Sequence, residues 1–122
     1  MDIKATSYGE WPTSNASDFG ELTHIPGGKG ANEAIAIARL DVPTAMVGRV
    51  GDDEHGAYLR DVFIQNGVDC SAVRGGGQQR SKDAEQVYTG TAVQIVSSNT
   101  AASRAVQFTV TCPGANWLVD EV

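Results

Sequence analysis

The feature that most constrains the fold of this chain is a glycine-rich loop followed directly by a helix-forming run. Residues 26–32 read Pro-Gly-Gly-Lys-Gly-Ala-Asn, and residues 33–40 contain neither glycine nor proline. The run is rich in strong helix formers, so the sequence predicts a helix over 29–40. The glycines let the backbone approach a group that a Cβ would keep away. The first N–H groups of a helix have no partner within it and can bind ligand oxygens.

Two side chains add polar chemistry to this loop. Lys29 supplies a cation, and Asn32 supplies an amide that both donates and accepts hydrogen bonds. This composition suits a pocket for a small, oxygen-rich molecule. The P-loop motif is absent because Gly30 follows the lysine, and the dinucleotide fingerprint is absent because Glu33 stands where a third glycine is needed. A tight turn without a ligand is the alternative interpretation of the loop by itself.

The residues after the loop predict alternating strands and helices. The apolar run 44–50 lacks the alternation of a half-buried strand, which is typical of a buried parallel strand. Apolar residues at helical spacing predict a helix over 54–66, and Val68 opens the next extended segment. Before this helix, Arg49, Asp52 and Asp53 are interpreted as turn and helix-start residues. The alternation predicts an α/β fold with a parallel sheet.

Four further segments are predicted to be extended. Short patches at 3–6 and 21–25 precede the glycine loop, while 91–96 and 104–111 predict a β-hairpin. Apolar residues alternate along its second strand: Val106, Phe108 and Val110. One face of the hairpin is therefore expected to be buried.

Composition excludes several classes of function. The 122 residues correspond to a single domain. The formal charge of −6 argues against a nucleic-acid partner. No apolar run approaches the roughly 18 residues of a membrane span, and no secretory leader pattern is visible, so we expect a cytoplasmic protein without a membrane partner. The residues that could bind a transition metal lack ligand spacing, and no metal site is predicted: His24, His55, Cys70 and Cys112.

The chain resembles the ribokinase-like, or PfkB-type, carbohydrate kinase family. Five segments carry the resemblance in the family's order: 27–32, 38–40, 47–53, 66–69 and 113–116. The resemblance implies a ribokinase-like doubly wound α/β sheet with a small β-sheet lid. It also implies transfer of the γ-phosphate of ATP to a sugar hydroxyl, with ribose as the favoured sugar.

The resemblance also assigns roles to parts of the single domain 1–122. It implies that 3–25 and 69–111 contribute lid strands and that 26–68 forms a βαβ core. The substrate-binding residues that it implies are Asp2, Gly27, Gly28, Lys29, Gly30 and Asn32. Gly27 and Gly28 would also serve as the hinge of the lid, and a homodimer through the lid is a further expectation. A solvated surface lysine and a helix cap are the alternative roles of Lys29 and Asn32.

Some of the family pattern has no counterpart in the chain. The Gly-Ala-Gly-Asp-like segment that holds the catalytic Asp is missing, as is an Asn-x-x-Glu segment. The resemblance therefore implies that the catalytic Asp and the sites for ATP and Mg²⁺, with K⁺ as a further candidate, lie beyond Val122. The fragment is expected to be inactive alone. An apolar strand is expected before Met1, interpreted as an internal methionine; an ordinary disordered start is the alternative.

Asp41 departs from the family pattern, which favours a glycine after Ala-Arg-Leu. We expect a left-handed turn there, at some energetic cost. Three alternative functions remain at this stage. They are a non-catalytic sugar-binding or dimerisation module, another sugar or nucleoside kinase of the same family, and an unrelated α/β nucleotide-binding protein.

Overall fold

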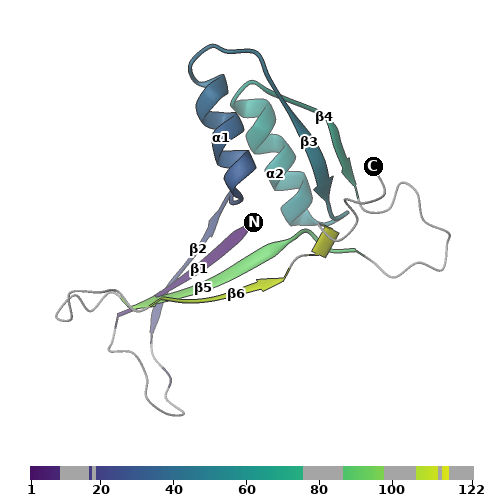
Figure 1. Ribbon diagram of the computed structural model, residues 1–122. Helices are drawn as coiled ribbons and strands as arrows, with labels where there is room; N and C mark the ends of the chain where they lie inside the picture. Colours follow the sequence, from purple (N-terminus) through teal and green to yellow (C-terminus); the bar gives the residue numbers. More distant parts are fainter. Residues whose placement is uncertain (9–16, 18, 76–86, 98–106, 113, 116–122) are drawn as a thin grey trace.

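The computed structural model describes residues 1–8, 17, 19–75, 87–97, 107–112 and 114–115. These residues form two helices and six strands (Figure 1). In chain order the elements are β1 Asp2–Ser7, β2 Gly20–Ile25, α1 Lys29–Ala38, β3 Thr44–Val50, α2 Glu54–Gln65, β4 Val68–Gly75, β5 Thr91–Ser97 and β6 Gln107–Cys112.

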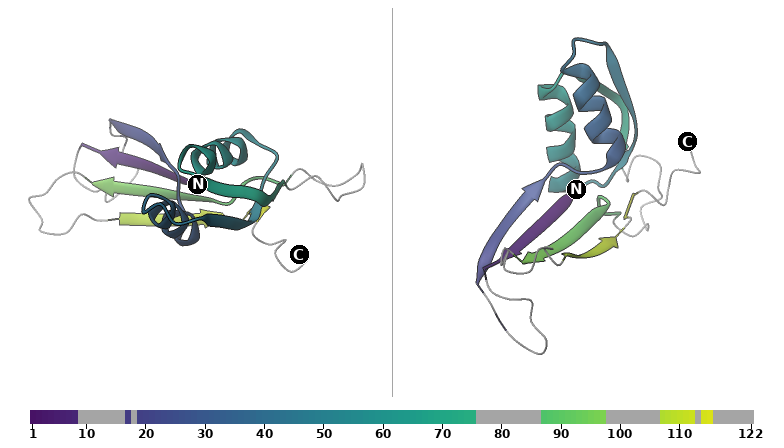
Figure 2. Two further views of the ribbon diagram at one scale, coloured as in Figure 1. Left: turned by 90° about the horizontal axis from the view of Figure 1, so that it is seen from above. Right: turned by 60° about the vertical axis from the view of Figure 1, so that its left-hand side comes forward.

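The strands form two separate sheets. β3 and β4 pair in parallel, from Thr44 opposite Val68 to Val50 opposite Gly75. The other strands form a four-stranded sheet in the order β2-β1-β5-β6, in which β1 and β5 are parallel and the outer pairs are antiparallel. Figures 1 and 2 show this sheet projecting from the lower end of the unit formed by the helices, β3 and β4. The predicted mixture of helices and strands is confirmed.

Both helices pack against the β3–β4 pair and share one hydrophobic core with it (Figure 1). The buried core residues are Met1, Ala31, Ala34, Val50, Leu59, Phe63, Val68 and Val73. On α1 the buried positions are alanines, whose small side chains let the helix approach the sheet closely. Ile37 of α1 is 44% exposed, and Val47 of β3 is 64% exposed.

The ends of the helices follow local backbone rules. α1 was expected to reach residue 40 but ends at Ala38, and Asp41 then adopts a left-handed conformation with φ of 58°. α2 ends at Gln65, one residue before the predicted end, and Gly67 follows with φ of 75°. The expected left-handed turn at Asp41 is thus confirmed. Within the described ranges neither helix combines the length and apolarity needed to cross a bilayer.

Two expectations about the lid strands need correction. Residues 69–75 were assigned to the lid, but they lie in β4, because the parallel pairing with β3 holds them in the α/β unit. The β5–β6 hairpin forms as expected, yet its apolar face is not buried: Phe108 is 53% and Val110 46% exposed. No described element covers this face, and Val106 lies outside the described residues.

The conformation of Asp41 generates a test of stability. Replacing Asp41 with glycine should raise the free energy of unfolding by about 0.5–1 kcal/mol, because glycine adopts positive φ without the steric cost of a Cβ. Urea unfolding of both proteins measures the difference. Asp41→Ala is the control and should lower stability, since it keeps the Cβ and loses the polar side chain. A less stable glycine variant would contradict the argument.

Candidate functional site

The side chain of Asp2 lies directly against the glycine loop. A Cβ added at Gly27 would overlap the carboxylate carbon and both oxygens of Asp2. Gly27 is buried. The β1–β2 pairing places Asp2 opposite Ile25, which lies two residues before Gly27 in the chain. The missing side chain of Gly27 is what lets the carboxylate lie on the loop. The structure thus joins two predicted site residues that are far apart in the sequence.

The loop ends at the start of α1 with exposed polar groups. Gly28 is the N-cap, with φ of 99°, and no side chain caps the helix. The first intrahelical hydrogen bond runs from the Asn32 N–H to the Gly28 oxygen, at 3.0 Å. The N–H groups of Lys29 and Gly30 therefore lack an intrahelical acceptor. The Lys29 and Asn32 side chains are exposed, and the capping role considered for Asn32 is wrong because it lies inside the first turn.

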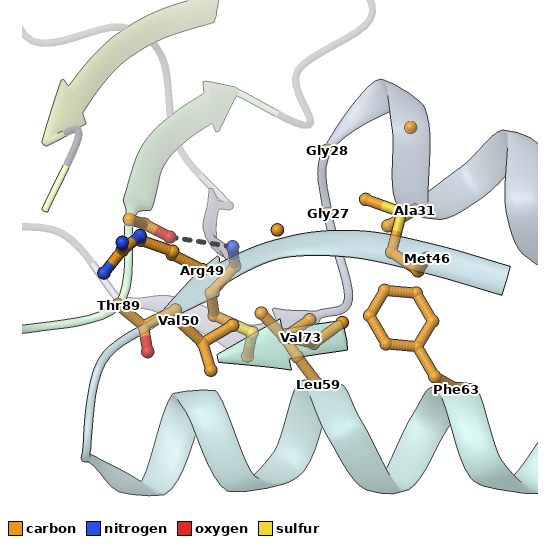
Figure 3. A pocket seen from close by; sticks show the side chains of 14 residues that line it. Gly27, Gly28, Ala31, Met46, Arg49, Val50, Leu59, Phe63, Val73 and Thr89 are labelled. Carbon is orange, nitrogen blue, oxygen red and sulfur yellow. Dashed lines mark hydrogen bonds between the residues drawn. The ribbon is translucent and has the colours of Figure 1, made fainter. Parts of the chain in front are cut away.

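A cavity of about 180 Å³ lies between the glycine loop, β3 and α2 (Figure 3). Its walls are mainly apolar, formed by Met46, Val50, Leu59, Phe63 and Val73. Gly27, Gly28 and Gly30 also line it, whereas Asp2, Lys29 and Asn32 do not. Such walls offer few partners to a ligand with many hydroxyl groups. The polar residues predicted for the site therefore lie outside this cavity.

The carboxylate of Asp53 joins α2 to the segment that precedes β5. As predicted, Asp53 begins the helix: it is the N-cap of α2, and its Oδ1 accepts from the Gly56 N–H at 2.8 Å. The N–H of Thr89 donates to Oδ2 at 2.7 Å, and the Thr89 hydroxyl donates to Oδ1. The same hydroxyl accepts from the Gly51 N–H at 2.9 Å. Sequence reasoning missed this role of Thr89; its only signal was a Thr-Gly pair before a predicted strand.

Hydrogen bonds dominate the net electrostatic state of Asp53. Partial burial raises the pKa of its carboxyl, whereas the hydrogen bonds from the Thr89 hydroxyl, the Thr89 N–H and the Gly56 N–H lower it, as does the nearby His55. The net pKa is lowered. Asp53 is therefore ionised at neutral pH, as an acceptor of three hydrogen bonds should be.

The start of β1 lies beside the same junction. The Met1 amino group donates to the Gly90 oxygen at 2.9 Å, and the Ala92 N–H donates to the Met1 oxygen at 2.8 Å. The N–H of Ala115 donates to the Tyr88 oxygen at 2.8 Å. Of the family-like segment 113–116, only Gly114 and Ala115 are described. No group of three or more His, Cys, Asp or Glu side chains in the described part of the chain is placed to hold a metal ion.

Comparisons with known proteins give a consistent result. The model of the pfkB family of carbohydrate kinases matches residues 1–112. The chain is 52% identical over 69 residues to the ribokinase of Bacillus subtilis and 40% identical over 62 residues to a fructokinase of Klebsiella pneumoniae. These matches include 56% and 51% of the chain but only 23% and 20% of the two relatives. The chain thus spans about a fifth of their length.

Solved structures show the same fold. The Arabidopsis thaliana ribokinase complexed with ribose and ATP matches 94% of the chain, with a TM-score of 0.68 and 28% identity. The Thermotoga maritima ribokinase matches 93%, with a TM-score of 0.70 and 21% identity. In each case the match is 33% of the solved chain. The expected ribokinase-like fold is confirmed, and the chain represents a part of it.

The Asp53–Thr89 junction predicts a large effect from a small substitution. Thr89 is 5% exposed, and Thr89→Val should lower the free energy of unfolding by about 1–3 kcal/mol, because it leaves the Gly51 N–H without its acceptor and removes one of the three hydrogen bonds to the Asp53 carboxylate. Thr91→Val is the matched control, since its hydroxyl donates only to the Thr89 oxygen, at 3.0 Å. Thr91→Val should lower the free energy of unfolding by less than about 1 kcal/mol, and urea unfolding of both variants at pH 7 measures the difference.

The effect of Thr89→Val on the free energy of unfolding should depend on pH. Because the folded-state pKa of Asp53 is lowered, its ionised form stabilises the fold above the ordinary Asp pKa of about 3.9. This contribution is lost as the pH falls through the lowered pKa. The stability difference between the original chain and Thr89→Val should therefore shrink between pH 7 and about pH 3. A difference that is constant over this range would contradict the role of the ionised carboxylate.

Proposed function

The chain belongs to the pfkB family of carbohydrate kinases, and we propose that it forms the sugar-binding part of a kinase that transfers the γ-phosphate of ATP to a sugar hydroxyl. Ribose is the first candidate, supported by the identity with a ribokinase and by the likeness to a ribokinase complexed with ribose and ATP. Fructose is the second candidate, because fructokinases also match this chain.

The observation that carries the proposal is the position of the Asp2 carboxylate on the glycine loop at the start of α1. A carboxylate accepts hydrogen bonds from two neighbouring hydroxyls, and the helix start adds N–H donors on the same loop. Lys29 and Asn32 supply further donors there. A sugar presents hydroxyls that both donate and accept, so this set matches its chemistry. Gly27 and Gly28 complete the set of proposed substrate-binding residues with Gly30.

Gly27 and Gly28 also connect the two parts of the structure. They follow β2 of the four-stranded sheet and precede α1 of the α/β unit (Figure 1). In the proposal they are the hinge about which the sheet closes over the sugar. Closure would exclude water from the acceptor hydroxyl and so favour transfer to the sugar over hydrolysis of ATP.

The contribution of this chain to the reaction would be binding and orientation. Holding the acceptor hydroxyl in line with the phosphate can supply several kcal/mol of the barrier reduction. ATP brings the transferable phosphate, and Mg²⁺, with K⁺ as a further candidate, would offset its charge. We assign the sites of these groups and the catalytic base to parts of the protein outside this chain. The free thiols of Cys70 and Cys112 fit a reducing compartment, so we also propose a cytoplasmic location.

The exposed apolar face of the four-stranded sheet supports a homodimer through the lid. The register places Val93 opposite Ile3 and Val110, and Ile95 opposite Phe108, so these side chains share one face. A contiguous apolar face on a protein surface typically marks an interaction site. A second copy of the sheet presents the same apolar face, as a two-fold symmetric interface requires.

Sugar kinetics test the binding proposal on the complete protein. Asp2→Asn should lower kcat/KM for the preferred sugar by roughly 10- to 150-fold, since hydrogen bonds to a charged group contribute about 1.5–3 kcal/mol. Lys29→Ala and Asn32→Ala should also lower kcat/KM for this sugar. A panel of ribose, fructose and a nucleoside identifies the acceptor.

The control is Asp61→Asn, which removes an exposed carboxylate from α2 and should leave the kinetics unchanged. The proposal fails if no member of the panel is phosphorylated, or if Asp2→Asn behaves like the control. The 122-residue chain alone should not consume ATP with ribose.

Sedimentation velocity tests the proposed dimer. Phe108→Lys places a charge on the apolar face and should convert a dimer into a monomer. Thr109→Lys places the same charge on the opposite face of β6 and should leave the dimer intact, because successive side chains alternate across a strand. A protein that is monomeric before substitution, or a Phe108→Lys variant that stays dimeric, would contradict the proposal.

A further inference from the structure

The two histidines of the chain meet in space, although they are distant in the sequence. His24 lies on β2 and His55 in the first turn of α2. Their ring centroids are 5.8 Å apart and the ring planes are inclined at 59°. The composition includes no other histidine. Neither histidine has metal-ligand spacing to a second ligand in the sequence, so their pairing is visible only in the structure.

The separation of the rings matches coordination of one transition-metal ion. An imidazole nitrogen binds such an ion at about 2.0–2.1 Å. The nitrogen lies about 1.2 Å from its ring centre, so one ion between two imidazoles places the centres about 5–6.5 Å apart. The observed 5.8 Å falls inside this range. A simple contact between aromatic rings covers a similar range, so a metal titration has to separate the two cases.

The surroundings of the pair favour a cation held in part by water. His24 is exposed and His55 is half-buried, which leaves open coordination positions. The ionised carboxylate of Asp53 lies close enough to His55 for the two groups to interact electrostatically. Because the described residues provide no set of three ligands, binding should be weaker than at a closed structural site.

The position of the pair gives an ion at this point a mechanical effect. His24 belongs to the four-stranded sheet and lies three residues before Gly27, while α2 packs on β4 in the α/β unit. An ion bound by both rings would cross-link the two parts of the structure beside the glycine loop. It would therefore restrict movement of the sheet relative to the α/β unit.

We propose that His24 and His55 form a binding site for a divalent transition-metal ion of the kind that prefers imidazole, such as Ni²⁺ or Zn²⁺. The site is independent of the proposed sugar kinase activity.

Thermal unfolding with Ni²⁺ tests the site, on protein that carries no histidine tag. Saturating Ni²⁺ should raise the Tm by roughly 5 °C, because an ion that binds only the folded state stabilises it by mass action. His24→Gln and His55→Gln should each abolish the shift. Cys112→Ser, which removes an exposed thiol, is the matched control and should keep it.

A second measurement does not depend on how the variants fold. Paramagnetic Ni²⁺ added to the original chain should broaden the ring proton signals of both histidines together. The proposal is overturned if Ni²⁺ leaves the Tm unchanged, if the shift persists in the histidine variants, or if only one histidine signal responds.

Discussion

The hydrogen bonds between Asp53 and Thr89 are the interaction on which the rest of the structure depends. One carboxylate caps the first turn of α2 and also holds the segment leading into β5. The close approach of this segment is possible because Gly51 and Gly56 have no side chains, and a Cβ on either would overlap its atoms or those of the neighbouring turn. A partly buried polar contact therefore joins the α/β unit to the segment that leads into the four-stranded sheet.

The glycine loop forms the second connection between the two parts. Gly27 brings the backbone against the Asp2 carboxylate, and Gly28 starts the helix with a backbone conformation that other residues avoid. A site at this position takes groups from both parts of the structure. The proposed sugar would then be held by a carboxylate from the sheet and by donors from α1, so its binding would depend on how the two parts are oriented.

Local patterns in the sequence were sufficient for the helices and for β3. The helix formers after the loop, the helical spacing of apolar residues over 54–66 and the apolar run at 44–50 act over a few residues, and the observed bounds differ by two residues at most. The glycine loop itself was identified for the same reason. The assignment of 69–75 to the lid was wrong because pairing between strands depends on partners elsewhere in the chain. The expectation that one face of the hairpin is buried was wrong for a similar reason, since alternation shows that a face is apolar but not what covers it.

The sequence by itself determined the elements, the glycine loop and the family resemblance, because each is carried by neighbouring residues. Only the tertiary structure decided that Asp2 lies on Gly27, that Thr89 binds Asp53, and that His24 meets His55. These contacts join residues from distant parts of the chain, and their geometry is set by strand register and by the packing of α2. A sequence contains the residues for such contacts, but only the folded backbone brings them within bonding distance.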